Sequence, residues 1–326
     1  MRKQRSLRTN GKACDLRQRN PIAIPVEAEK PSKPACRSLR TDTDRDPVSP
    51  LRPLQTPTSN SHAPENMPAL LVLIHGLFSS PQEFGLINNS FRLAGIEVIA
   101  LEIDGYTDGH QRGMSQWRDW LKAASDALDA AVPPGRRVIL AGLCVGGVLA
   151  AALALERKAQ TQGLALLSPT FDYDGWGQSR WRHLRHVAYA LKLDRFIRIA
   201  EREPYGIKNE RIRRWVIEEL KARRKSAVGP ALLPLWAIHE AERLMAHVRA
   251  NIWQIGCRTL VIHAREDELS ALPGVERMFH EIAAKDKSLV VLENSYHMIT
   301  IDNDRARVAA ELARFVRRDI DVADPL

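Results

Sequence analysis

Six short apolar runs, separated by longer stretches of helical periodicity, dominate the chain after residue 68. Each run is apolar on both faces, which is typical of strands that helices cover on both sides. The alternation predicts an α/β fold with a mainly parallel, doubly wound sheet of about six to seven strands. The predicted strands are residues 70–76, 97–103, 137–143, 163–169, 258–264 and 288–294.

Two helical stretches show an apolar face that would pack against this sheet. The first covers residues 115–131, and Ser115 is in position to cap its first turn. The second covers residues 302–319. The apolar faces consist of Trp117, Trp120, Leu121, Ala124 and Leu128 in the first stretch, and of Val308, Leu312 and Phe315 in the second.

The alternation stops between residues 170 and 257, where Arg-rich helical segments replace the apolar runs. An insertion of this size between two strands predicts a helical cap over residues 171–250. The sheet domain is then divided into residues 68–170 and 251–326. Five of the seven tryptophans fall between residues 170 and 257, where they suit either an apolar acyl pocket or the core of the cap itself.

The N-terminal residues 1–67 contain about half of the prolines and little apolar periodicity, which predicts a disordered, basic tail. The chain carries a formal net charge of +9, with 13 Lys/Arg against 7 Asp/Glu in residues 1–66 and 15 against 8 in residues 171–230. A basic tail can bind nucleic acid or anionic lipid, or direct a protein to an organelle. No nucleic-acid-binding motif accompanies it, so we expect no nucleic-acid partner.

The four cysteines are Cys14, Cys36, Cys144 and Cys257, and they form neither a CxxC pair nor a Cys/His cluster. We therefore expect no zinc site, no disulfide framework and no cofactor. No apolar run approaches the ~18 residues of a transmembrane helix, and no secretory signal is evident. These features predict a cytoplasmic protein, and they leave its oligomeric state open.

The sharpest motif is Gly142-Leu143-Cys144-Val145-Gly146-Gly147, between a predicted strand and an alanine-rich helix. This is the pattern of a nucleophile elbow, with cysteine in the place of serine. Gly142 and Gly146 leave room for the tight turn, the helix N-terminus favours a thiolate, and the amide of Val145 is free to bind an oxyanion. The alternative is a small apolar cysteine packed at a strand–helix junction.

A second motif, HGLFSSPQEF (residues 75–84), follows the first predicted strand. In a fold with a nucleophile elbow, this loop supplies the second oxyanion donor. The amide of Leu77, directly after His75 and Gly76, is the best candidate, and the amide of Phe78 is the alternative. We expect His75 to brace the loop by hydrogen bonds.

Two further predicted strands end in residues that would complete a catalytic triad. Asp267 follows the strand at 258–264 and is the expected orienting acid, with its neighbours Glu266 and Glu268 as alternatives. His297 follows the last predicted strand and is the expected general base. The chain order Cys144, Asp267, His297 is the order nucleophile, acid, base that this elbow fold uses.

Taken together, HGLFSSPQEF, GLCVGG, LVIHARED and NSYHMITID resemble the carboxylesterase and monoacylglycerol-lipase branch of the α/β hydrolases, whose members are often described as serine aminopeptidase-like. The resemblance covers about residues 68–320. It implies an α/β-hydrolase fold with a helical cap insertion and hydrolysis of acyl esters. It also implies Cys144 as nucleophile, Asp267 as acid, His297 as base, and Leu77 and Val145 as oxyanion donors.

The cysteine departs from that family, which has serine at this position. GLCVGG is similar to the box of polyhydroxyalkanoate synthases, which take acyl groups from coenzyme A. We therefore expect an acyl hydrolase acting on a small-molecule ester or thioester, and the thioester could be bound to coenzyme A or a carrier protein. The alternatives are an acyltransferase that uses such thioesters and a non-catalytic binding protein. The basic cap suits anionic thioester carriers or is simply a solvated helical surface.

Overall fold

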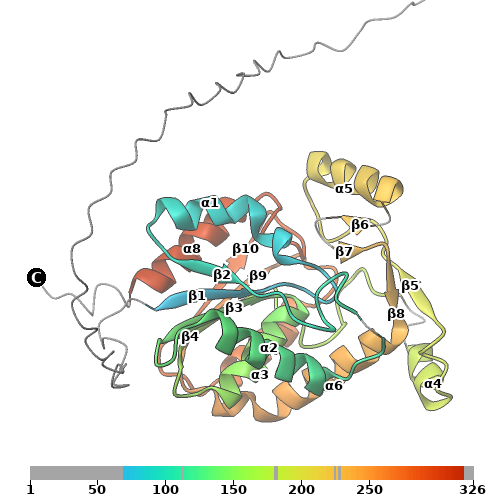
Figure 1. Cartoon of the computed structure of the whole chain (residues 1–326). Helices are drawn as coiled ribbons and strands as arrows, with labels where there is room; N and C mark the ends of the chain where they lie inside the picture. The colour runs from blue at the N-terminus through green and yellow to red at the C-terminus, as the bar shows by residue number, and fades with distance from the viewer. Residues whose placement is uncertain (1–68, 112, 180–182, 224, 227–228, 319–326) are drawn as a thin grey trace, which may run out of the picture. The chain divides into compact units, whose positions relative to one another are not determined.

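The computed structural model describes residues 69–318, except residues 112, 180–182, 224 and 227–228. The predicted disordered tail, residues 1–67, lies outside the described residues. The six predicted runs all form strands of one parallel sheet, in the order β10-β9-β4-β3-β1-β2 (Figure 1). The predicted doubly wound parallel sheet is therefore confirmed. Its strands are β1 (Leu70–Ile74), β2 (Val98–Ala100), β3 (Val138–Leu143), β4 (Thr161–Leu167), β9 (Arg258–Ala264) and β10 (Lys287–Leu292).

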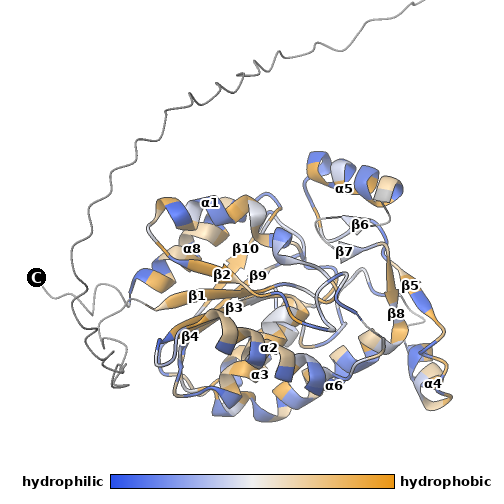
Figure 2. Cartoon of the chain, in the orientation of Figure 1, coloured by the Kyte–Doolittle hydropathy of each residue, from blue (hydrophilic) through white to orange (hydrophobic). Residues whose placement is uncertain are grey.

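Alternate side chains of each central strand enter two separate cores, one on each face of the sheet. Leu71 and Leu73 of β1 pack on the side of α1 (Gly85–Leu93) and α8 (Arg305–Arg317). Leu70 and Val72 pack on the opposite side. That second face is covered by α2 (Trp117–Ala131), α3 (Val145–Glu156), α6 (Leu235–Asn251) and α7 (Leu272–Glu281). In Figure 2 the apolar strands lie between these helices, whose outer faces are hydrophilic.

Helix α2 begins one residue later than a Ser115 cap requires. Gln116 is its N-cap, and its side chain and that of Asp119 form a reciprocal capping box. The Ser115 hydroxyl instead accepts the indole N–H of Trp120 at 2.7 Å. The predicted cap was therefore wrong, because the Ser115 hydroxyl bonds the Trp120 indole and the Gly105 carbonyl while Gln116 takes the N-cap position. The predicted apolar faces of α2 and α8 are buried.

The insertion segment, residues 171–234, contains short strands as well as helices. Its elements are α4 (Leu184–Ala190), β5 (Arg198–Ala200), α5 (Glu210–Arg223), β6 (Lys225–Ser226), β7 (Gly229–Pro230) and β8 (Leu232–Pro234). β5 pairs with β8 and β6 with β7, both antiparallel. Helix α6 falls within the predicted cap limit of residue 250, yet it packs against α2 and α3 in the sheet domain.

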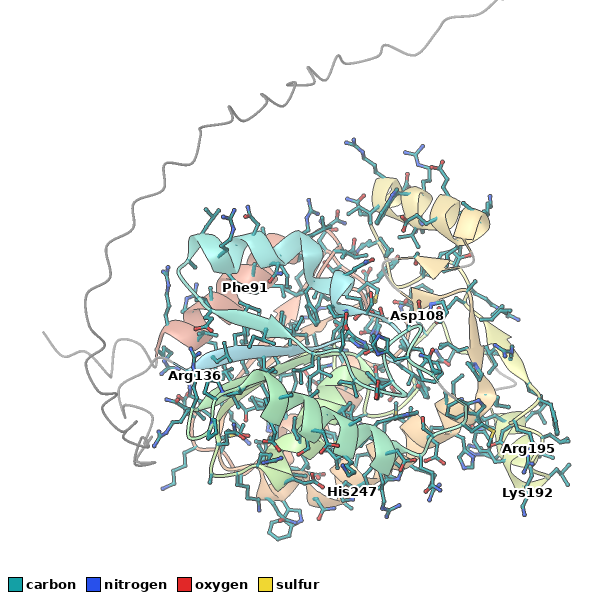
Figure 3. The ribbon with its side chains drawn as sticks, in the orientation of Figure 1. Phe91, Asp108, Arg136, Lys192, Arg195 and His247 are labelled. Carbon is teal, nitrogen blue, oxygen red and sulfur yellow. The ribbon has the colours of Figure 1, made fainter. Side chains whose placement is uncertain are left out.

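The functional residues gather at the carboxyl edge of the sheet. Figure 3 marks the two edges: Arg136 precedes β3 at one edge, and Asp108 follows β2 near the other. Phe91, also labelled there, points from α1 into the core. The insertion segment lies beyond the carboxyl edge, and Lys192 and Arg195 mark its outer end in the same view. None of the described helices combines the length and apolar character needed to span a membrane.

Candidate active site

Cys144 occupies a strained turn between β3 and α3. Its backbone angles are φ 59° and ψ −127°, a combination that residues other than glycine rarely adopt. Strand β3 continues up to this residue, since the Cys144 amide donates to the carbonyl of Leu167 at 3.0 Å. The turn leaves the Cys144 side chain partly exposed, and Sγ lies 3.4 Å from the hydroxyl of the buried Thr170.

The two glycines that flank the turn have no room for a side chain. A Cβ on Gly142 would lie 2.2 Å from the carbonyl oxygen of Gly146. A Cβ on Gly146 would lie 2.1 Å from the carbonyl oxygen of His75, at the end of β1. The G-x-C-x-G pattern is therefore a packing requirement of a helix that begins against two neighbouring strands.

His297 and Asp267 form a buried pair beside Cys144. Nδ1 of His297 donates to Oδ2 of Asp267 at 2.7 Å. Oδ1 of Asp267 accepts the amides of Leu269 and Ser270 at 2.8 and 2.9 Å, which fixes the carboxylate. Nε2 of His297 is buried and has no hydrogen-bond partner among the described residues. It is the nitrogen left for Cys144, with which the ring interacts electrostatically.

The charges of these groups stabilise one another. Burial alone lowers the pKa of His297, but the charges of Asp267 and Cys144 and the hydrogen bond to Asp267 raise it well above its usual value. Burial also opposes ionisation of Asp267, but the charge of His297 and its hydrogen bond lower the pKa of that carboxyl below its usual value. The arrangement therefore favours an imidazolium held by a carboxylate.

The two alternative acids lie elsewhere. Glu266 is exposed and pairs with Lys208 at 2.7 Å. Glu268 accepts the backbone amide of His297 at 3.2 Å instead of a ring nitrogen, and burial raises its pKa to about 7. Of the three consecutive acids, Asp267 is the one that contacts the imidazole.

His75 braces the loop after β1, as a chain of hydrogen bonds shows. Nδ1 donates to the carbonyl of Gly76, and Nε2 accepts the hydroxyl of Thr107, both at 2.8 Å. Thr107 in turn accepts the amide of Ile103 at 2.7 Å, which leaves its proton for His75. Burial lowers the pKa of His75 to about 4, so the ring is neutral and can fill both roles.

The two expected oxyanion donors lie in the loop after β1, at Leu77, and directly after Cys144, at Val145. Val145 is the first residue of α3, where amides have no acceptor within the helix. No described residue accepts a backbone hydrogen bond from Leu77. Phe78 adopts a positive φ of 54°, and its ring packs against Trp236 at 5.6 Å. Strain at Phe78 and that aromatic contact fix the course of the loop.

Sequence reasoning missed three residues of this region. Thr170 contacts the sulfur of Cys144, and nothing local in the sequence marks it. Glu83 is a buried acid whose Oε2 accepts the amide of Gly76 at 2.7 Å. Asp302 is fully buried and accepts four backbone amides, two from the insertion segment and two from the His297 loop. Glu83 follows the polar residues Ser79, Ser80 and Gln82, so nothing local in the sequence marks it as buried.

The structure describes four of the tryptophans between residues 170 and 257. These four differ in how far their side chains are buried. Trp236 is buried against Phe78. Trp176, Trp215 and Trp253 are 60%, 45% and 61% exposed. The tryptophans therefore form neither one acyl pocket nor one core. Trp181 lies outside the described residues.

Comparison with known proteins identifies the family. Residues 65–304 match the family described as serine aminopeptidase, S33, and this match spans well over half of the chain. The chain belongs to the S33 family. The family description names a serine enzyme, whereas the elbow of this member carries Cys144.

Relatives of this S33 member are distant but match over most of their length. A thermostable monoacylglycerol lipase from Bacillus sp. (strain H-257) is 21% identical over 77% of this chain and 91% of the lipase. A carboxylesterase from Bacillus subtilis (strain 168) is 22% identical over 76% and 92%. The structure of a soluble variant of monoglyceride lipase from Saccharomyces cerevisiae has a TM-score of 0.64 at 16% identity, over 79% of this chain and 88% of that one. The expected α/β-hydrolase fold is thereby confirmed, and the chain is an α/β hydrolase of the esterase and lipase type.

Proposed function

We propose that this S33 member hydrolyses acyl esters or acyl thioesters through a covalent acyl-enzyme on Cys144. The observation that carries the proposal is the geometry of His297. Its Nδ1 is locked by Asp267 at 2.7 Å, and its buried Nε2 makes no hydrogen bond to a described residue, while the ring interacts electrostatically with Cys144. The curated relatives, a lipase and a carboxylesterase, support ester substrates.

In the first half of the reaction, His297 takes the thiol proton and the sulfur of Cys144 attacks the acyl carbonyl carbon. A carbon–sulfur bond forms, and the amides of Leu77 and Val145 stabilise the oxyanion. The oxyanion collapses, the bond to the leaving alcohol or thiol breaks, and His297 returns the proton to the leaving group. The acyl group remains on Cys144 as a thioester.

In the second half, His297 removes a proton from water, which attacks the thioester carbonyl. The carbon–sulfur bond breaks, the carboxylic acid leaves, and the thiol of Cys144 is restored with its proton. Asp267 holds the ring in place and stabilises its positive charge throughout. Gly76, Gly142, Gly146 and His75 support the two loops that carry the oxyanion donors.

Acyl transfer is the second candidate function, and the cysteine favours it. An acyl group on Cys144 is a thioester, which amines and thiols attack readily. The insertion segment is basic, which suits the anionic coenzyme A or carrier-protein part of a thioester donor. Product analysis with butyryl-coenzyme A separates the two: free butyrate indicates hydrolysis, whereas an acylated added amine or alcohol indicates transfer.

Alkylation by iodoacetamide between pH 5 and 9, read by intact mass and peptide mapping, tests the nucleophile. We expect fast labelling of Cys144 at pH 6 in the wild type and at least ~10-fold slower labelling in His297→Ala. His280→Ala is the matched control, because His280 lies on α7 outside the site. Cys144→Ser must lose the label, and Cys257→Ala must keep it.

Hydrolysis of p-nitrophenyl butyrate by the same variants completes the test. The wild type and His280→Ala should form a butyryl adduct on Cys144 and release butyrate. Cys144→Ser should form no thioester adduct. Slow, ordinary alkylation in the wild type that His297→Ala leaves unchanged would contradict the catalytic role and support a non-catalytic binding protein.

A further inference from the structure

A buried carboxyl group contacts the loop that carries Leu77. Glu83 belongs to the short helix η1 (Pro81–Phe84), and its side chain turns back under that loop with 2% of its surface exposed. Its Oε2 accepts the amide of Gly76 at 2.7 Å. A Cβ placed on Gly76 would lie 3.2 Å from Oε1 of Glu83 and 3.6 Å from Cβ of Cys144. The Glu83 carboxyl group and Cβ of Cys144 therefore lie close to the same side of Gly76.

The contacts of Gly76 determine which way the Leu77 amide points. The Gly76 carbonyl accepts two hydrogen bonds, from Nδ1 of His75 at 2.8 Å and from the amide of Ser79 at 3.2 Å. In a trans peptide the N–H of the next residue points away from that carbonyl. With the Gly76 amide held by Glu83 as well, both peptides around Gly76 are fixed. The Leu77 amide therefore points away from His75 Nδ1 and the Ser79 amide, the two donors that bond the Gly76 carbonyl.

Glu83 is also an ionisable group close to the other charges of the site. It interacts electrostatically with His297, from the loop after β10, and with Tyr106, from the loop after β2. Cβ of Cys144, just before α3, lies on the same side of Gly76 as this carboxyl group. A carboxylate at this position adds negative charge beside the place where the oxyanion would form, whereas a neutral carboxyl group does not.

We propose that Glu83 is a positioning residue that holds the Leu77 amide in its oxyanion-binding orientation and that must be protonated for fast acylation of Cys144. The proposal rests on the acyl-enzyme function given above and adds a pH-dependent control to it. A neutral Glu83 keeps its acceptor oxygen for the Gly76 amide without opposing the oxyanion.

The direction of the pH effect follows from the burial of Glu83. Burial raises the pKa of this carboxyl to about 7, although the Gly76 amide, Ser79 and the charge of His297 favour ionisation. Glu83 is therefore protonated below about pH 7 and ionised above it. Acylation of the wild type should slow as the pH rises through that value.

The test compares acylation with alkylation in wild type, Glu83→Gln and Glu83→Leu between pH 5.5 and 9. Acylation by p-nitrophenyl butyrate passes through an oxyanion, whereas alkylation by iodoacetamide is a displacement at carbon that does not. Gln keeps an acceptor oxygen for Gly76 but has no charge, so Glu83→Gln should lose the alkaline decline in acylation, on the order of tenfold. Glu83→Leu should acylate about tenfold more slowly at every pH, because the loop loses its anchor.

Alkylation of Cys144 should be unchanged in both variants. The inference is overturned if Glu83→Gln keeps the wild-type alkaline decline, or if acylation and alkylation change in parallel. Failure of the acyl-enzyme function itself is recognised separately, because the wild type would then form no butyryl adduct at any pH. Restoration of the wild-type pH profile in Glu83→Asp would further support a carboxyl group as the cause.

Discussion

Nε2 of His263 lies 3.6 Å from Oδ2 of Asp267, the same oxygen that accepts Nδ1 of His297 at 2.7 Å. Two buried imidazoles therefore face one carboxylate oxygen. His263 donates its Nε2 proton to the carbonyl of Ser270 at 2.9 Å, and burial lowers its pKa. Because His263 stays neutral, His297 is the imidazole that carries the positive charge opposite Asp267.

Replacing His263 by Phe should weaken the turn that holds Asp267. The ring volume is kept, but the buried carbonyl of Ser270 loses its donor, which costs about 1–3 kcal/mol in unfolding free energy. Urea denaturation measures this loss, and butyryl adduct formation should slow several-fold. His280→Phe, on the exposed side of α7, is the control. Equal stability of the two variants would contradict the role given to His263.

The elbow should not tolerate alanine at Gly146. A Cβ there would lie 2.1 Å from the His75 carbonyl oxygen, and the β1 backbone cannot move aside without disturbing the sheet. We expect Gly146→Ala to lower the unfolding free energy by about 3 kcal/mol and to abolish adduct formation. Gly85→Ala is the matched control, since its φ is −53° and no atom lies within 4 Å of the added Cβ. That control should be stabilised by about 0.5 kcal/mol.

Asp302 should hold the insertion segment to the His297 loop. Its two oxygens accept the amides of Lys208 and Asn209 from the insertion segment and of Tyr296 and Asn303 from the loop, at 2.7 to 2.9 Å. Asp302→Ala leaves these four donors unpaired, so we expect a loss of about 3 kcal/mol or more.

Hydrogen exchange locates the effect of Asp302. Amides 206–209 and 296–300 should lose protection in Asp302→Ala. Asp304→Ala is the control, because Asp304 bonds the loop residues Asn294 and Ser295 and no described residue of the insertion segment. Unchanged protection of residues 206–209 in Asp302→Ala would refute this role.

Glu268 should contribute a decline in stability between pH 4.5 and pH 7. Burial raises the folded-state pKa of Glu268 from 4.5 to about 7. Between these values the folded state keeps a proton that the unfolded state releases, so this contribution is complete below pH 4.5 and lost as the pH rises to 7.

Glu268→Gln should therefore flatten the curve. The decline in unfolding free energy between pH 4.5 and 7.5 should shrink by roughly 2 kcal/mol relative to wild type. Glu266→Gln is the control, because Glu266 is an exposed neighbour and should follow the wild-type curve. A wild-type slope in Glu268→Gln would argue against a buried, protonated carboxyl group.

The strands and the elbow could be predicted because their signals are local. A run that is apolar on both faces suits a strand between two helical layers, and the central strands β1, β3, β4 and β9 are accordingly buried. The edge strands β2 and β10 are only partly buried. The two glycines around Cys144 are likewise dictated by a turn of fixed geometry. Asp267 and His297 follow strand ends, so their nearness at one sheet edge could be inferred from topology alone.

The remainder depends on contacts that sequence spacing does not encode. Glu83 reaches Gly76 only because η1 folds back, and Asp302 meets residues about 90 positions away. β5 and β8 are three residues each, too short for an alternating pattern, and β5 is exposed throughout while β8 is partly exposed. The predicted end of the cap at residue 250 had a local signal. The sequence of α6 carries an apolar helical stripe, which is typical of a helix that covers the sheet, at Ala237, Ala241, Leu244, Met245 and Val248.

The shared carboxylate of Asp302 has a consequence for protein engineering. Any exchange of the insertion segment with that of a relative would bring a foreign stretch of backbone to an acceptor shaped for residues 208 and 209. The donor fragment would have to include its own counterpart of the 296–303 loop. Insertion and loop are thus one transferable module, although residues 235–295 lie between them in the chain.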